Sequence, residues 1–86
     1  MTVALSADVS ATEVDDGLVL LDQRKGSYWH LNGTGAMALR LLLAGSSPQE
    51  AAAQITERFP DAADRALTDV EALLRASREA RLVVES

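Results

Sequence analysis

The segment Gly45–Glu50, with the sequence GSSPQE, constrains the fold more than any other part of this chain. Gly45 is expected to end one helix, because glycine readily adopts the left-handed conformation found at helix C-termini. Ser47 then supplies an N-cap, Pro48 takes the first helical position, and Glu50 completes a capping box. Two helices therefore meet across a short turn, which predicts a helix-turn-helix in the middle of the chain.

Apolar residues at helical spacing lie on both sides of this turn. The first helix is expected to be capped by Asn32 or Thr34 and to end at Gly45. The second should end before Pro60. Its buried stripe is predicted to contain Ala51, Ala52, Ile55 and Phe59.

A third helix is predicted to begin at Asp61 or Asp64 and to run to about Ala80. One stripe of this helix should face the core, and it consists of Leu67, Val70, Leu74 and Ser77. A second set lies beside that stripe at the same spacing and consists of Asp69, Leu73 and Ala76. The apolar residues 82–84 form a tail that should pack back on the domain.

The first third of the chain is predicted to form strands at residues 2–5, 17–22 and 27–31. Asp15-Asp16-Gly17 is a turn signal before the second of these, and residues 23–26 form a hairpin loop into the third. The predicted fold class is α+β: a small winged helix-turn-helix, with a three-stranded antiparallel sheet followed by three helices. One domain is expected over residues 1–86.

Composition limits the classes of function. The net charge is −5, from 13 acidic and 8 basic residues, which disfavours a duplex nucleic-acid binder. The chain has no cysteine, so disulfides and thiolate metal sites are excluded. Neither a signal peptide nor a run of apolar residues long enough to span a bilayer is recognisable, so no membrane partner and a cytoplasmic location are expected.

The strand at residues 27–31, SYWHL, holds the only tyrosine, tryptophan and histidine of the chain. Strand alternation places Tyr28 and His30 on one face and Trp29 and Leu31 on the other. Ser27 lies three residues from His30 and so on the opposite face, which argues against a nucleophile–base pair and against an enzyme.

Cofactor sites are also not expected. One histidine without cysteine makes a poor metal site, and Asp15-Asp16 lacks the spaced ligands of a calcium loop. Gly33-Thr34-Gly35 lacks the longer glycine fingerprint and the lysine of a phosphate-binding loop. We therefore expect no metal and no cofactor.

A peptide-binding edge is the remaining hypothesis. If the strand at residues 27–31 lies at the edge of the sheet, its unpaired backbone groups can pair with an extended peptide. Trp29, Leu31 and the Leu73/Ala76 flank of the third helix would line a groove beside it. Whether Trp29 belongs to the core or to the groove stays open at this level.

The order and spacing of several motifs resemble those of PqqD-like proteins, the recognition elements of ribosomally made peptide natural products. The resemblance covers residues 12–84 and rests on a hairpin ending in Leu31-Asn32, the small residues 33–35, the SPQE helix start, and Asp69-Val70 with Leu73-Leu74. Size and composition are most similar to the stand-alone recognition protein of the split leader-peptidase system in lasso-peptide biosynthesis. In one departure, family members often have glycine where this chain has Arg81.

The resemblance implies a non-catalytic protein that binds the leader region of a precursor peptide as an added strand. It also implies delivery of the precursor to a transglutaminase-like leader peptidase, after which a cyclase closes the ring. Leaders of this type carry a tyrosine and a proline a few residues apart, and the tyrosine would suit an apolar pocket.

The predicted peptide-binding residues come from one strand and one helix. The strand, acting mainly through its backbone, contributes Ser27, Tyr28, Trp29, His30 and Leu31. The third helix contributes Asp69, Leu73 and Ala76, with Asp69 placed to meet a basic leader residue. Two alternatives stay open: a PqqD-like chaperone serving a radical enzyme in cofactor or other peptide maturation, and a DNA-binding winged helix.

Overall fold

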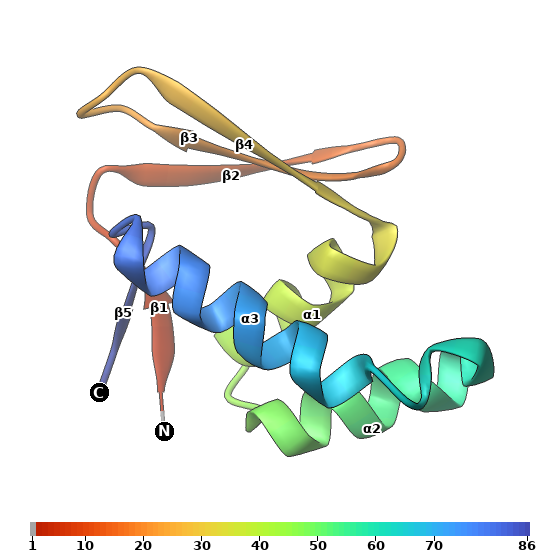
Figure 1. Cartoon of the computed structure of the whole chain (residues 1–86). Coiled ribbons are helices and arrows are strands. Elements are labelled where there is room, and N and C mark those ends of the chain that lie inside the picture. Colours follow the sequence, from red (N-terminus) through yellow and green to blue (C-terminus); the bar gives the residue numbers. More distant parts are fainter. Residues whose placement is uncertain (1) are drawn as a thin grey trace.

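The computed structural model describes residues 2–86 and consists of a three-stranded sheet above three α-helices, with a two-stranded ribbon at one end (Figure 1). The strands are β1 (Val3–Leu5), β2 (Val9–Val14), β3 (Gly17–Asp22), β4 (Ser27–Asn32) and β5 (Val83–Glu85). The helices are α1 (Gly33–Leu43), α2 (Pro48–Arg58), the short 3-10 helix η1 (Pro60–Ala62) and α3 (Ala66–Glu79).

The three-stranded sheet has the order β2-β3-β4 and is antiparallel throughout. This confirms the α+β class and corrects the identity of the first strand. The segment predicted at residues 2–5 pairs instead with β5 near the C-terminus, and the sheet strand is residues 9–14. The physical reason is the two-residue turn at Asp15 and Asp16, which pairs Gly17 with the residue immediately before the turn, Val14.

Gly17 allows β3 and β4 to approach each other where β4 passes into α1. Its φ is +154°, and a Cβ atom at this position would lie 1.8 Å from the carbonyl oxygen of Leu31. Any side chain larger than hydrogen would therefore force the two strands apart. Gly17 fixes the position of the end of β4 relative to the sheet.

The helix boundaries around the turn agree with the capping signals. Asn32 caps α1, where its Oδ1 accepts a hydrogen bond from the Gly35 N–H at 2.9 Å. The capping box of α2 is complete: the Glu50 N–H donates to Ser47 Oγ at 3.1 Å, and the Ser47 N–H donates to Glu50 Oε1 at 2.8 Å. The sequence prediction for this part of the fold is confirmed.

Two details of the predicted core are wrong. Phe59 is 41% exposed, because α2 ends at Arg58 and the non-helical backbone at Phe59 leads directly into Pro60 and η1. The third helix begins only at Ala66, and Ala66 occupies the buried position predicted for Leu67, which is 38% exposed. Val70, Leu74 and Ser77 are buried as predicted.

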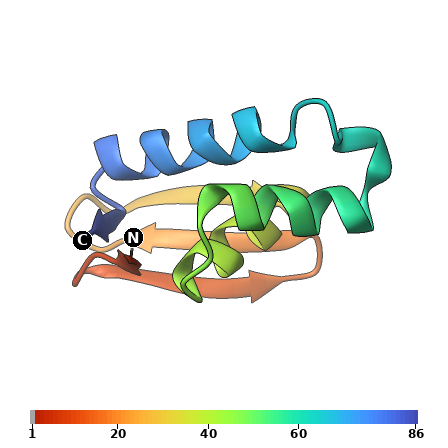
Figure 2. The ribbon, with the colours of Figure 1, turned by 90° about the horizontal axis from the view of Figure 1, so that it is seen from below.

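The inner faces of β3 and β4 and the three helices share one hydrophobic core. Within it α3 packs on α2, α1 and β5, while its contact with β4 in the described chain is marginal at most. Seen from below, α3 runs alongside β4, and β2 lies on the opposite side of the sheet (Figure 2). This arrangement leaves one side of β4 facing α3.

The turn after α3 is a Schellman motif built on a residue that is not glycine. The Leu82 N–H donates to the Ser77 carbonyl and the Arg81 N–H donates to the Arg78 carbonyl, while Arg81 itself has φ 61°. A left-handed conformation costs a residue with a Cβ atom about 1–2 kcal/mol. Arg81 therefore retains the turn geometry that glycine would adopt with less strain, and Leu82 is buried beyond it.

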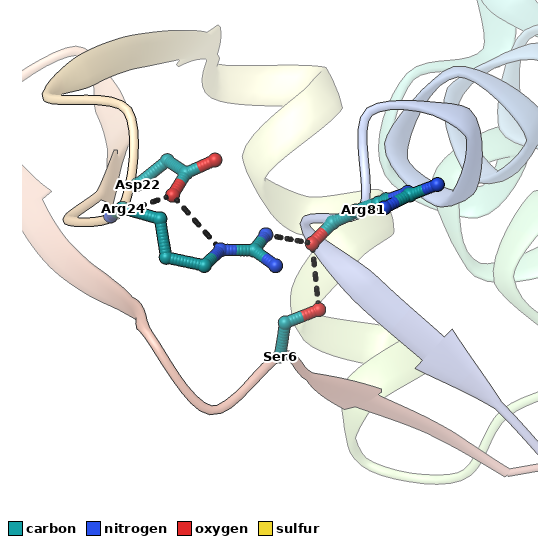
Figure 3. A network of polar contacts seen from close by, with 4 residues as sticks. All are labelled: Ser6, Asp22, Arg24 and Arg81. Atoms are coloured by element: carbon teal, nitrogen blue, oxygen red, sulfur yellow. Dashed lines mark hydrogen bonds and ion pairs between the residues drawn. The ribbon is translucent and has the colours of Figure 1, made fainter.

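A polar network stabilises this turn from two other loops (Figure 3). The Arg81 carbonyl oxygen accepts hydrogen bonds from Ser6 Oγ at 2.7 Å and from Arg24 Nη2 at 3.0 Å. The backbone N–H of Arg24 also donates to Oδ1 of Asp22 at 3.0 Å. The network connects the β1–β2 loop, the β3–β4 loop and the turn between α3 and β5, so it fixes the end of the hairpin from which β4 begins.

Asp22 is 1% exposed and is the acidic member of this network, paired with the Arg24 guanidinium. Burial on its own raises the pKa of its carboxyl, but hydrogen bonds from the Arg24 N–H and guanidinium and from the Lys25 N–H outweigh burial and leave the pKa lowered. The carboxylate is therefore ionised at neutral pH and holds the loop before β4.

Candidate functional site

Strand β4 lies at an edge of the sheet: within residues 2–86, β3 is its only partner strand. Its six residues, SYWHLN, carry no acidic side chain and no lysine or arginine. An unpaired edge that carries no carboxylate, lysine or arginine can accept another strand, because such charges are one of the common means by which an edge is protected from pairing.

The sheet register shows which backbone groups of β4 are free. Val14 and Gly17 pair directly across a two-residue turn, so they form a hydrogen-bonded pair. Because hydrogen-bonded and non-hydrogen-bonded pairs alternate, Val19 also bonds toward β2, and its β4 partner His30 does not bond to β3. The N–H and C=O groups of His30, and of Tyr28 by the same alternation, therefore point to the free edge.

The side chains of β4 alternate between the two faces of the sheet, as predicted. Tyr28 and His30 lie on the outer face, where Tyr28 is 72% exposed. His30 Nε2 lies 3.1 Å from Oδ1 of Asp16 in the β2–β3 turn. On the inner face Leu31 is buried in the core, and Trp29 is partly buried and packs against the core. Trp29 therefore contributes part of its surface to the core.

A pocket of about 340 Å³ lies between the end of β4, the first turns of α1 and the first half of α3. We call it the α3 pocket; its lining consists of Asn32, Thr34, Gly35, Ala38, Ile55, Ala62, Arg65, Ala66, Asp69, Val70 and Leu73. Its apolar wall comes from the side of α3 that holds Leu73. The pocket therefore begins where the free edge of β4 ends.

Two of the eight predicted site residues, Asp69 and Leu73, line the α3 pocket. Ala76 lies one turn further along the same flank of α3 and is exposed. Ser27, Tyr28, Trp29, His30 and Leu31 form β4 itself and do not line the pocket. The structure thus places the two groups next to each other at the Asn32 end of β4.

The pocket residues outside α3 were not predicted. Asn32, Thr34 and Gly35 serve as the cap and first turn of α1, and the same turn forms the floor of the pocket. The sequence signal was present, because small residues at a helix start leave space that large ones would fill.

The charges at the pocket rim form one ion pair. Arg65 Nε lies 3.7 Å from Oδ2 of Asp69, one helical turn away, and both side chains are more than 60% exposed. Exposed pairs of this kind contribute at most about 1 kcal/mol. Breaking this ion pair therefore costs little free energy, so the Asp69 carboxylate can pair with another basic group instead of Arg65.

Other classes of site lack the required grouping of residues. Among residues 2–86 no cluster of three or more histidine, cysteine, aspartate or glutamate side chains is placed to hold a metal ion. Ser27 and His30 lie on opposite faces of β4. None of the described helices has the length and apolar character needed to cross a lipid bilayer.

Comparison with known proteins identifies the family. The model of coenzyme PQQ synthesis protein D (PqqD) matches residues 17–83 of this chain. The chain belongs to the PqqD family. This confirms the resemblance found in the sequence. No curated protein matches the chain significantly.

Two solved structures resemble this PqqD-family chain over nearly its whole length. A lasso peptide synthetase B1 complexed with the leader peptide is 33% identical, with a TM-score of 0.88, and the match covers 99% of this chain and 100% of that chain. TbiB1 in complex with the TbiA(beta) leader peptide is 27% identical, with a TM-score of 0.82, and the match covers 100% of this chain and 98% of that chain. Both relatives were solved with a leader peptide bound.

Proposed function

We propose that this protein binds the leader region of a ribosomally made precursor peptide in lasso-peptide biosynthesis. In this proposal the leader adds a strand to β4 and places side chains between β4 and α3. The protein then delivers the precursor to a separate transglutaminase-like leader peptidase and a cyclase. The free backbone edge at Tyr28 and His30, directly beside the α3 pocket, is the observation that carries the proposal.

The energetics of such a site require both the edge and the pocket. A main-chain hydrogen bond contributes only about 1 kcal/mol net, so the few bonds available on β4 give weak binding. Burying one large apolar side chain adds about 1.5–3 kcal/mol. A volume of about 340 Å³ is large enough for one aromatic side chain, which suits the leader tyrosine that the family resemblance predicts.

The protein acts without catalysis in this proposal. The chain has one histidine and no cysteine, and the only serine of the strand, Ser27, lies on the opposite face from His30. Peptide-bond cleavage is therefore assigned to the partner enzyme. We propose a single domain over residues 1–86, located in the cytoplasm with the precursor.

A second candidate is a peptide chaperone that serves a radical enzyme, because the matching family model is that of a coenzyme PQQ synthesis protein. It would use the same edge and the same pocket with a different partner enzyme. Neighbouring genes distinguish the two: a leader peptidase and a cyclase support the lasso proposal, and a radical enzyme supports the alternative.

DNA binding is disfavoured by the same features that disfavoured it in the sequence. The second helix, α2, carries only one cation, Arg58, and the chain has a net charge of −5. Salt-dependent affinity for duplex DNA would support this function against the proposal.

The test is a titration of a fluorescently labelled leader peptide, taken from the precursor encoded beside this gene, followed by fluorescence polarisation. Leu73→Asp is expected to abolish binding, because it puts a charge on the apolar wall of the α3 pocket. The matched control is Leu67→Asp, on the same helix but outside the pocket and already 38% exposed.

Thermal unfolding of both variants shows whether the fold survives, and Leu73→Ala gives a milder change at the same position. Wild-type affinity in Leu73→Asp would contradict the proposed groove. Loss of binding in Leu67→Asp to the same extent would show that α3 acts through stability alone.

A further inference from the structure

The surface depression that begins at the α3 pocket continues past the end of β4. Thr34, Ala62 and Arg65 line both the α3 pocket and a second hollow of about 410 Å³ around η1. Arg58 and Phe59 line that second hollow and also a third one of about 420 Å³ beside the β2–β3 turn. We call the second and third hollows together the Phe59 furrow.

An exposed aromatic side chain lies in the middle of the furrow. Phe59 is 41% exposed, and the guanidinium carbon of Arg58 lies 6.0 Å from the centre of its ring. Val14, which is 37% exposed, lines the far part of the furrow. The furrow thus holds two of the five large hydrophobic side chains that are exposed in the described chain.

Two arginines give the near part of the furrow a positive charge in an acidic protein. Arg58 and Arg65 line the second hollow together with one acidic residue, Asp61. Arg58 forms no ion pair with any residue between positions 2 and 86, and Arg65 has only the weak pair with Asp69. This part of the surface therefore fits an acidic group next to an apolar one.

The direction of strand addition decides which part of a peptide reaches the furrow. All strand pairs in the described fold are antiparallel, and antiparallel pairing is slightly more stable than parallel pairing. A peptide added antiparallel to β4 runs from the Asn32 end toward Ser27. The residues N-terminal to its paired segment then lie at the α3 pocket and beyond it.

We propose that the Phe59 furrow binds the segment of the precursor peptide that lies N-terminal to the strand-paired residues. That segment places an apolar or aromatic side chain against Phe59 and a carboxylate near Arg58 and Arg65. The inference rests on the proposed function, because the furrow is continuous with the proposed leader site. It adds a second recognition element outside the β4 edge.

The experiment uses the leader peptide of the precursor encoded beside this gene, labelled at its C-terminus, and a series shortened one residue at a time from the N-terminus. Phe59→Ser and Arg58→Glu are each expected to weaken binding of the full leader by about three- to tenfold. Neither variant should change the affinity for peptides from which the N-terminal flank has been removed.

The matched controls are Leu67→Ser for the exposed apolar side chain and Arg75→Glu for the exposed charge, since both residues lie on α3 outside the furrow. Both controls should bind the full leader as the wild type does. Thermal unfolding verifies that Phe59→Ser is folded, and Arg58→Glu tests the same surface without changing an apolar side chain.

Two results would overturn the inference in different ways. If both furrow variants bind the full leader with wild-type affinity while Leu73→Asp does not bind, the furrow is not a peptide site and the proposed function stands. If the wild type binds no peptide of the series, the proposed function and the inference fail together.

Discussion

The two edges of the three-stranded sheet have the same hydrogen-bonding capacity and very different surroundings. Both β2 and β4 have a single partner strand among residues 2–86, the central strand β3. Hydrogen-bonded and non-hydrogen-bonded pairs alternate along β2 as they do along β4. The backbone N–H and C=O groups of Ala11 and Glu13 therefore point away from β3, as those of Tyr28 and His30 do on β4. Unpaired backbone alone therefore does not define a binding site.

The edges differ in charge. On β2 the carboxylate of Glu13 accepts a hydrogen bond from Arg40 Nε at 2.9 Å. This hydrogen bond holds the pKa of Glu13 below its usual range against a smaller opposing effect of burial, and the positive charge of Arg40 adds to the lowering. An ionised, paired side chain at an edge discourages strand addition. The sequence of β4 contains no carboxylate, lysine or arginine side chain.

The edges also differ in what lies beside them. In the view of Figure 2, α3 lies on the β4 side of the sheet, and β2 lies on the opposite side. Helix α3 supplies the Leu73 wall of the α3 pocket, which reaches the end of β4 at Asn32. A peptide on β4 could bury a side chain in that pocket. Both strands have free backbone groups, but only β4 ends at the α3 pocket. We infer that this position relative to α3 makes β4, and not β2, the edge to which a peptide adds.

The largest expected effect comes from introducing proline at matched positions on the two edges. His30→Pro removes an outward N–H and puts a ring in the path of an added strand, without removing a bond to β3. We expect leader binding to fall below detection, a loss of at least about tenfold. Ala11→Pro removes the corresponding outward N–H on β2, without a side-chain contact like that of His30 with Asp16, and should leave affinity unchanged. Fluorescence polarisation measures both.

A control variant that breaks a hydrogen bond between β4 and β3 distinguishes blocked strand addition from unfolding of the protein. Trp29→Pro removes a bond between β4 and β3, so it should lower the melting temperature, while His30→Pro should lower it much less. Equal loss of leader binding in Ala11→Pro and His30→Pro would mean that the two edges contribute equally to binding. This result would contradict the choice of β4 as the binding edge.

The smallest expected effect on binding comes from Arg81, which lies away from both edges. Arg81→Gly relieves a left-handed conformation and should stabilise the protein by about 1 kcal/mol, seen as a higher melting temperature. The hydrogen bonds from Ser6 and Arg24 end on the backbone carbonyl and remain. Leader affinity should not change. A lower melting temperature would contradict the strain assigned to Arg81.

The sequence predicted the parts of this fold that depend on local signals. The cap at Asn32, the capping box at Ser47 and Glu50, and the alternation along β4 each involve residues within a few positions of one another. The pairing of β1 with β5 was not predicted, because it joins the two ends of the chain and neither segment carries a turn that indicates its partner. Strand β2 is the exception among the missed strands, because the turn at Asp15 and Asp16 is a local signal for the residues that pair with β3.

The parts of the candidate site that depend on local periodicity were also predictable from the sequence. The strand at residues 27–31 and the Asp69–Leu73 flank followed from strand and helix periodicity, whereas the position of that strand at the edge of the sheet was a hypothesis. The contribution of α1 to the pocket did not, because it depends on how closely the end of β4 approaches β3 at Gly17. The exposure of Phe59 was not predicted either, because Phe59 has the spacing of the buried stripe but is the C-cap residue, whose backbone is no longer helical.

Hydrogen exchange of individual amides, measured by NMR with and without the leader peptide, tests the choice of edge most directly. The amides of Tyr28 and His30 should become protected when the peptide binds, because their N–H groups point to the free edge of β4. Those of Ala11 and Glu13 should exchange at the same rate as before. Protection at Ala11 and Glu13, or binding without any protection at Tyr28 and His30, would contradict strand addition to β4.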